Sequence, residues 1–146
     1  MMNNTFYNEI LTDHNLHPAH KKKLEDANLV LEGVNPSCGD DIILELKEEN
    51  GVITDGAFVG SDCAISQASV DMMLELIIGK TKEEALQLAD LFSRMIKGEA
   101  KGDELEPLEE AMSLADISKM PARVKCAVLG WHTMEELLEK EAEKNL

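Results

Sequence analysis

The sequence feature that most constrains the fold is an Asn50-Gly51 pair between two runs of strand-forming residues, 41–47 and 52–59. Asn-Gly between such runs is a strong signal for a two-residue β-hairpin loop, because both loop positions need a positive φ. We therefore expect two antiparallel strands joined at this pair. With these two residues as the loop, the predicted cross-strand pairs are Leu44–Ala57 and Ile42–Val59.

The same register, extended away from the turn, predicts that Asp40 faces Ser61 and that Cys38 faces Cys63. Side chains on a strand point alternately to its two faces, so Cys38, Asp40 and Cys63 should share one side of the hairpin. Pro36 and nearby glycines will distort the strand ends. The pattern therefore predicts that two thiols and a carboxylate lie close together at one end of the sheet.

Helical patterns dominate the rest of the chain. After Cys63, apolar residues recur at every third or fourth position up to Gly79, which suits a helix end. Capping boxes begin at Thr81 and Thr133, and Pro121 suits a first helical turn. We expect a strand at 28–33 and helices at 5–14, 64–79, 81–98, 105–113, 121–129 and 133–144. These elements predict one α+β domain over residues 1–146, a small three-stranded antiparallel sheet with helices packed on one face.

Three cysteines and one carboxylate are the candidates for chemistry. Cys38 lies in a Pro-Ser-Cys-Gly-Asp turn, where exposure is expected, and Cys63 precedes a helix whose dipole favours a thiolate. Cys126 lies among apolar residues and is as readily explained as a core residue. Zinc accepts Cys and Asp ligands, and thiolates also bind iron–sulfur clusters. We therefore expect a metal site of Cys38, Asp40, Cys63 and Cys126; a purely structural zinc site stays open.

Charge and composition limit the partners and the compartment. The net charge of -15 at pH 7 disfavours nucleic acid and anionic membranes, which both attract basic surfaces. No apolar run approaches the ~20 residues of a membrane span. The N-terminal residues lack the pattern of a signal peptide, and an odd number of cysteines indicates a reducing compartment. We therefore expect a cytoplasmic protein with no nucleic-acid or membrane partner.

Two groups of polar residues have more than one explanation. Arg123 and Lys125 flank the third cysteine. They would offset the negative charge of a thiolate-rich metal site, or they are ordinary solvated side chains. His14, His17 and His20 have the spacing of a helical metal face, but a proline lies between them, so we expect surface positions.

Three motifs in order resemble the IscU/NifU-like iron–sulfur scaffold family. They are Asn-Pro-Ser-Cys-Gly-Asp at 35–40, Gly-Ser-Asp-Cys-Ala-Ile-Ser-Gln-Ala-Ser at 60–69 and Val-Lys-Cys-Ala-Val-Leu-Gly-Trp at 124–131. The resemblance covers nearly the whole chain. An extra segment at about 99–119, and Lys125 where the IscU branch has histidine, are similar to the SufU branch. The chain also lacks the Leu-Pro-Pro-Val-Lys motif of the family.

The resemblance implies zinc held by Cys38, Asp40, Cys63 and Cys126, and an α+β fold. It also implies a partner, a pyridoxal-phosphate-dependent cysteine desulfurase of the SufS type, within the iron–sulfur assembly machinery. By the same resemblance Cys38 is the catalytic sulfur acceptor and Arg123 binds the desulfurase. The expected function is that of a zinc-dependent sulfur acceptor and transfer protein in iron–sulfur cluster assembly. The alternative is a scaffold that assembles a transient Fe–S cluster on the same ligands.

Overall fold

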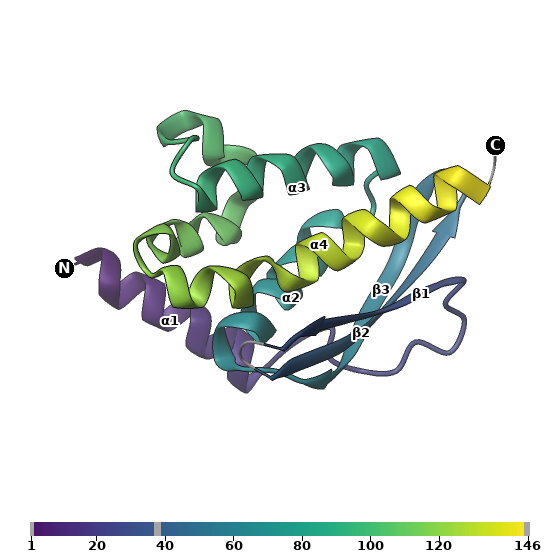
Figure 1. Ribbon diagram of the computed structural model, residues 1–146, viewed down its shortest axis with the longest axis horizontal. Coiled ribbons are helices and arrows are strands. Elements are labelled where there is room, and N and C mark those ends of the chain that lie inside the picture. The colour runs from purple at the N-terminus through teal and green to yellow at the C-terminus, as the bar shows by residue number, and fades with distance from the viewer. Residues whose placement is uncertain (1, 37–38, 145–146) are drawn as a thin grey trace.

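A computed structural model describes residues 2–36 and 39–144 of the chain. In chain order its elements are α1 (Met2–Leu16), β1 (Leu29–Asn35), β2 (Asp40–Glu49), β3 (Val52–Ser61), α2 (Ala64–Ile77), α3 (Lys82–Ile96), the 3-10 segment η1 (Gly102–Lys119) and α4 (Pro121–Lys144) (Figure 1). The strands form one antiparallel sheet in the order β1-β2-β3. The predicted α+β class with a three-stranded sheet is therefore confirmed.

The hairpin turn forms at Asn50 and Gly51, which both have positive φ, but the register beyond it differs from the prediction. The two residue pairs next to the turn follow the predicted register. A bulge between Lys47 and Glu48 then shifts the register of the remaining pairs by one residue. The predicted pairs Leu44–Ala57, Ile42–Val59 and Asp40–Ser61 are wrong. The observed pairs are Leu44–Phe58, Ile42–Gly60 and Asp41–Ser61. The predicted pair of Cys38 with Cys63 involves a residue outside the described ones.

Burial of two large side chains explains the bulge. In an uninterrupted strand Ile53 and Phe58 would point to opposite faces, because side chains alternate between the faces and these two residues are an odd number of positions apart. The extra residue, Thr54, lets both side chains point to the core face, and both are fully buried. The unbulged register would have buried Ala57 opposite Leu44 and left Phe58 on the outer face.

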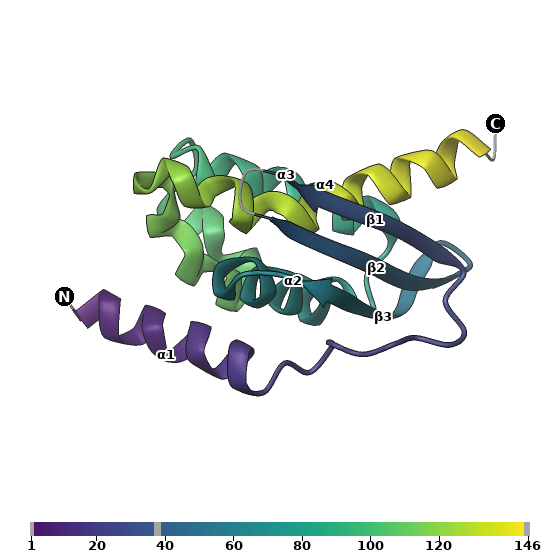
Figure 2. The same cartoon turned by 60° about the horizontal axis from the view of Figure 1, so that its bottom comes forward.

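Helices α2 and α4 cover the core face of the sheet, and α1 lies along α2 (Figures 1 and 2). The core between these layers is built mainly from aliphatic side chains with few aromatic ones. Trp131 of α4 stacks on Phe92 of α3, with ring centroids 4.4 Å apart. This stacking fixes the C-terminal helix against the rest of the helical layer. No helix among the described residues combines the length and apolar character that crossing a membrane requires.

The C-terminal helix is continuous, so the prediction of separate helices at 121–129 and 133–144 is wrong. Thr133 does not cap a helix: its hydroxyl donates to the carbonyl of Leu129 at 2.7 Å, and the residue is buried. A Cβ on Gly130 would come within 2.4 Å of Val70 Cγ2. Gly130 therefore marks a place where α4 packs closely against α2.

The acidic segment before α4 is more regular than expected. A short helix was predicted at 105–113, whereas η1 spans Gly102–Lys119 with a kink at Glu109, where φ is 51° and ψ is -125°. Most of its apolar residues are buried, and the segment packs against α3, α2, α4 and α1. The segment is thus an integral part of the helical layer.

Candidate metal centre

Asp40 and Cys63 meet where β2 begins and α2 begins. The Asp40 side chain is buried, and its Oδ1 accepts a hydrogen bond from the Cys63 backbone N–H at 2.8 Å. Its Oδ2 lies 3.8 Å from the Cys63 sulfur. Cys63 is the N-cap of α2, and its sulfur accepts from the N–H of Ser66 at 3.5 Å. The beginning of α2 therefore places the Cys63 sulfur next to the Asp40 carboxylate.

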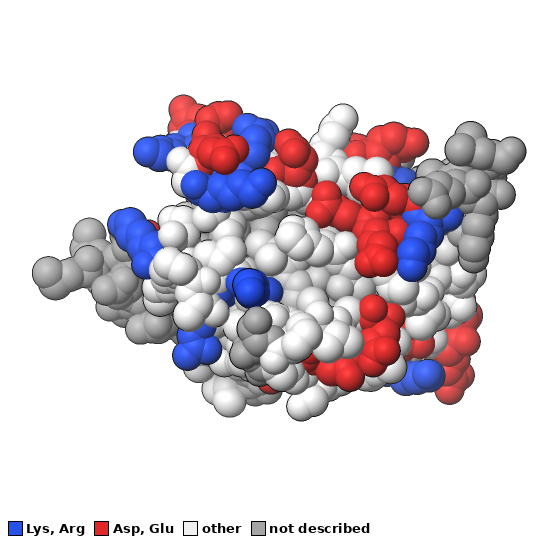
Figure 3. Space-filling model, viewed as in Figure 1, with Lys and Arg blue, Asp and Glu red and all other residues white. Residues whose placement is uncertain are grey.

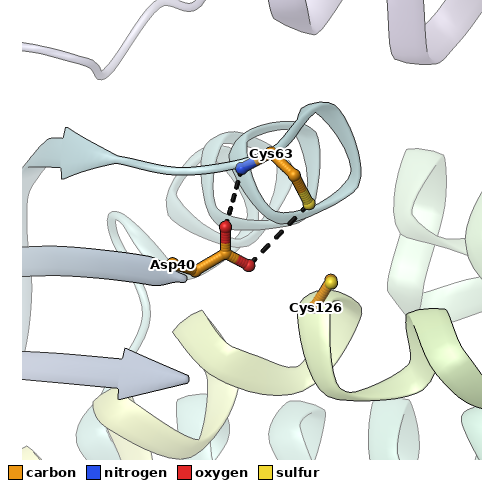
Figure 4. Close-up of side chains that lie close together, drawn as sticks. All are labelled: Asp40, Cys63 and Cys126. Atoms are coloured by element: carbon orange, nitrogen blue, oxygen red, sulfur yellow. Dashed lines mark hydrogen bonds between the residues drawn. The ribbon is translucent and has the colours of Figure 1, made fainter. Parts of the chain in front are cut away.

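Cys126 reaches the same place because a buried hydroxyl fixes α4 on α2. Ser69 Oγ donates to the Ala127 carbonyl at 2.6 Å and accepts from the indole N–H of Trp131 at 3.1 Å. Ser69 is fully buried, so these contacts determine how far α4 can slide along α2. Cys126, next to Ala127, is buried and points toward the beginning of α2 (Figure 4).

Figure 4 shows Asp40, Cys63 and Cys126 pointing toward one another from a strand, a helix N-terminus and a helix. One donor atom from each lies within 4.8 Å of the other two. Two sulfurs and one carboxylate oxygen at this spacing are a donor set that zinc and iron both accept. The donor chemistry of these three residues therefore fits the metal that the sequence predicts.

The fourth predicted ligand, Cys38, lies outside the described residues. Asp40 follows it by two residues, and two residues span at most about 7 Å. The N–H of Gly39 donates to the Asn35 carbonyl at 3.0 Å. Gly39 has a φ of 74°, a conformation that favours glycine.

A close approach of two strands brings the donors together. Gly60 on β3 has a φ of 137°, and a Cβ there would lie 2.2 Å from the backbone oxygen of Asp41. Only glycine lets β3 pass this close to β2 just before the chain turns toward Cys63. The glycine had been expected to distort the strand end, and it brings Cys63 next to Asp40.

One charged pair beside the centre was not predicted from the sequence. The side chain of Asp62 is buried; burial raises the pKa of its carboxyl group, and Lys21, whose Nζ is 3.4 Å from Oδ1, partly opposes that shift. Its Oδ2 has no hydrogen-bond partner within the described part of the chain. Lys21 also contacts the side-chain oxygen of Gln67. The Lys21–Asp62 pairing could not be foreseen, because it joins a loop to a position 41 residues later.

Arg123 lies one helical turn before Cys126 and is exposed, as is Lys125. In Figure 3 several basic side chains lie on the half of the visible face nearer the N-terminus, and acidic side chains gather over the C-terminal part of α4. The beginning of α4 belongs to the first half (Figure 1). Arg123 is therefore accessible to a partner that approaches the three-donor cluster.

Comparison with known families and proteins agrees with this arrangement. A sequence model described as NifU-like N terminal domain matches residues 6–144. A protein of Streptococcus pyogenes serotype M1 named iron-sulfur cluster assembly scaffold protein IscU is 42% identical over 95% of this chain and 86% of its own length. A protein of the same name from Thermotoga maritima is 44% identical over 92% of this chain and 93% of its own.

Two further relatives carry names of the SufU type. The zinc-dependent sulfurtransferase SufU of Bacillus subtilis is 39% identical over 94% of this chain and 92% of its own length. A crystal structure from Fervidobacterium islandicum, of a proposed iron-sulfur cluster assembly scaffold protein for the SUF system, has a TM-score of 0.84. It is 38% identical and covers 89% of this chain and 94% of its own.

Proposed function

This chain belongs to the NifU-like N-terminal domain family of IscU and SufU proteins, and from that premise we propose that it is a zinc-dependent sulfur acceptor in iron–sulfur cluster assembly. The observation that carries the proposal is the convergence of Asp40, Cys63 and Cys126 within 4.8 Å. Cys38 would be the fourth ligand. The similarity to the zinc-dependent sulfurtransferase of Bacillus subtilis over nearly the full chain supports the choice of zinc.

Three of the ligands would keep their positions during transfer, and the fourth would leave the metal. Asp40, Cys63 and Cys126 are fixed by a strand, a helix N-terminus and a packed helix, as their contacts require. Gly39, the residue after Cys38, has a positive φ, and a neighbouring glycine lowers the steric barrier to a change of backbone conformation. When bound, Zn2+ would keep the thiols deprotonated at neutral pH. Cys38 is therefore the thiolate best placed to react.

The transfer itself is a thiolate–persulfide exchange. The Cys38 sulfur attacks the outer sulfur of a persulfide on the partner, and a new S–S bond forms while the partner's S–S bond breaks. The electron pair of the broken bond leaves on the partner's cysteine thiolate, and the hydrogen of the persulfide stays on the transferred sulfur. Cys38 then carries the persulfide, and no external oxidant or reductant is consumed.

The proposed partner is a pyridoxal-phosphate-dependent cysteine desulfurase of the SufS type, acting in a reducing compartment such as the cytoplasm. The persulfide of such an enzyme must reach Cys38 for the transfer to take place. Arg123 is exposed within one helical turn of Cys126, so it is positioned to bind an acidic group of the desulfurase. Its guanidinium would orient the two proteins during transfer.

Transfer of radioactive sulfur from labelled cysteine, catalysed by a SufS-type desulfurase, tests this function. Wild-type protein should become labelled at Cys38, and Cys38→Ala should accept no sulfur. Arg123→Ala should require a higher protein concentration for half-maximal labelling, while Lys119→Ala, an exposed basic control on η1, should behave as wild type. Labelling of Cys38→Ala at the wild-type level would refute the proposed transfer.

A scaffold function is the second candidate, because the relatives from Streptococcus pyogenes and Thermotoga maritima are both named scaffold proteins. The same four residues would then hold a transient Fe–S cluster. Metal analysis of aerobically purified protein separates the two functions. Colourless protein with one zinc per chain supports sulfur transfer, whereas brown protein with iron and acid-labile sulfide supports the scaffold.

A further inference from the structure

A second group of titratable side chains lies between α1, α2 and η1, away from the three-donor cluster. His14 of α1 is buried, which corrects the expectation of a surface position. Its Nδ1 is 2.6 Å from Oδ2 of Asp71 on α2, and its Nε2 is 3.1 Å from Oε1 of Glu110 on η1. Asp71 follows Cys63 by eight residues along a helix, a rise of about 12 Å. The two groups are therefore separate.

Asp71 fixes the orientation of the imidazole. Its side chain is buried, and its Oδ1 accepts from the backbone N–H of His20 at 2.9 Å. Its Oδ2 accepts from His14 Nδ1 and, at 3.4 Å, from the N–H of Ala19. These three contacts hold the Asp71 carboxylate in place, and Nδ1 of His14 faces it. The other ring nitrogen, Nε2, then points away from Asp71 toward Glu110.

A small cavity lies between α2 and η1, and carboxylates line it. Glu75, one turn after Asp71 on α2, has a donor atom within 4.8 Å of those of His14 and Asp71. Glu75 and Glu110 both line a cavity of about 120 Å³, together with Met72, Leu76, Leu108 and Glu109. Burial raises the pKa of Glu75, as do the negative charges of Asp71 and Glu110, while His14 opposes that shift. A cation in this space would stabilise the carboxylates.

We propose that His14, Glu75 and Glu110 bind a divalent first-row transition cation, such as Fe2+ or Mn2+, while Asp71 orients the imidazole. A ligating histidine commonly donates its other ring N–H to a carboxylate, and the His14–Asp71 hydrogen bond has this arrangement. One imidazole and two carboxylates form a harder donor set than two thiolates and a carboxylate. The site would therefore select a different metal from the cysteine centre.

Both carboxylate ligands have room to adjust. The Glu110 side chain is 53% exposed, and Glu75 is exposed as well, so each can rotate toward a cation that replaces the His14–Glu110 hydrogen bond. A bound cation would join α1, α2 and η1 through one ligand from each. This inference does not depend on the proposed sulfur transfer, because it uses none of the residues of that reaction.

Titration with Mn2+ tests the site, because Mn2+ prefers oxygen and nitrogen ligands to thiolates. Protein loaded with one equivalent of zinc is titrated, and free Mn2+ is followed by its electron paramagnetic resonance signal. Wild-type protein should bind one Mn2+ per chain. The Glu75→Gln/Glu110→Gln variant should bind at least tenfold more weakly. Glu99→Gln/Glu106→Gln removes the same charge at exposed positions and should bind as wild type does.

Thermal unfolding gives a second measurement on the same proteins. Mn2+ should raise the unfolding midpoint of wild type and of the control, but not that of Glu75→Gln/Glu110→Gln. The inference is overturned if wild type binds no Mn2+ at millimolar concentration. It is equally overturned if both double variants lose Mn2+ binding alike, because the cation is then attracted only by general negative charge. In either case the cluster is an ion pair that only connects three elements.

Discussion

At the scale of single residues, Asp40 has two separate contacts with Cys63. One oxygen accepts the backbone N–H of Cys63, and the other lies near its sulfur. The first contact positions the beginning of α2, and the second places the carboxylate in the donor cluster. A substitution at Asp40 therefore affects both the local backbone and the proposed metal site, and the two effects can be measured separately.

Asp40→Ala should weaken zinc binding by at least about 10-fold, because even residues that only hydrogen-bond to metal ligands contribute roughly 10- to 100-fold to metal affinity. Asp40→Asn keeps an oxygen that can accept the Cys63 N–H, so it should retain the wild-type unfolding midpoint of the metal-free protein. Its zinc affinity should still fall, because the charge is lost. Competition with a chromophoric chelator measures the affinity. Wild-type affinity in both variants would exclude Asp40 as a ligand.

His14 makes stability depend on pH. The hydrogen bond to Asp71, against the opposing effect of burial and with help from Glu110, raises its pKa from 6.5 to about 9. Its contribution is therefore fully present below pH 6.5 and is lost as the pH rises through about 9. The contribution is on the order of 3 kcal/mol, since the pKa rises from 6.5 to about 9 and one pKa unit corresponds to about 1.4 kcal/mol.

Urea unfolding of metal-free protein between pH 6 and pH 10 checks this dependence. Wild type should be more stable than His14→Gln at pH 6, and the difference in the free energy of unfolding should shrink toward pH 10. Because glutamine does not titrate, the change in the difference reports His14 itself. A constant difference across the range would show that His14 contributes by packing and not by charge.

At the scale of elements, the contact between α2 and α4 determines the position of Cys126. Alanine normally stabilises a helix relative to glycine by about 1 kcal/mol. At position 130, however, a Cβ would come within 2.4 Å of Val70 Cγ2. The tertiary contact should therefore outweigh the local helix propensity.

Gly130→Ala is expected to destabilise the protein by roughly 1–3 kcal/mol, the cost of overpacking a core. Val70→Ala in the same chain should recover part of this loss, because it removes the methyl group that the new Cβ would meet. The four proteins of this double-mutant cycle are compared by urea unfolding. Additive effects would mean that Val70 and residue 130 do not meet.

The sequence predicts local features better than long-range ones. The Asn50-Gly51 turn and the capping box from Thr81 to Glu84 depend on a few neighbouring residues, and both form as predicted. The bulge at Thr54 could not be predicted, because it arises from the need to bury Phe58 together with Ile53. The alternation of side chains along a strand, extrapolated from the turn, does not reveal that an extra residue interrupts the pairing.

The candidate site also has local features that the sequence predicts and long-range features that it does not. The hairpin prediction placed Asp40 and Cys63 close together although its register was wrong. A shift of one residue changes which residues pair, but it leaves both residues at the same end of the sheet. The position of Cys126 depends on Ser69 and Trp131, whose contacts span about sixty residues of chain. Cys126 was grouped with the other candidate ligands by its residue type and by the resemblance to a known family, and no local pattern predicted its position. His14 was misjudged because its partners lie 57 and 96 residues away.

At the scale of the whole molecule, the proposed zinc site would link the sheet to both helices that cover it. Asp40 comes from β2, Cys63 from the beginning of α2 and Cys126 from α4. A ligand that binds only the folded state stabilises it by about 4 kcal/mol when its free concentration is 1,000 times Kd. The stabilisation is therefore a property of the entire fold and not of one element.

Removal of zinc with a chelator should lower the unfolding midpoint by roughly 10 °C, since 1 kcal/mol corresponds to about 2–4 °C for a chain of this size. Differential scanning fluorimetry of zinc-loaded and chelated protein measures the change. Readdition of one equivalent of zinc should restore the midpoint. Identical midpoints with and without zinc would show that the metal does not connect these three elements.

The order of the ligands along the chain has a consequence for biosynthesis. Asp40 and Cys63 leave the ribosome while the sheet and α2 can already form, but Cys126 follows only with α4. A nascent chain that stops before α4 therefore lacks one of the donors, whatever metal is available in the cell. Metal uptake would then mark the last step of maturation, and chains truncated before the C-terminal helix would be released without metal.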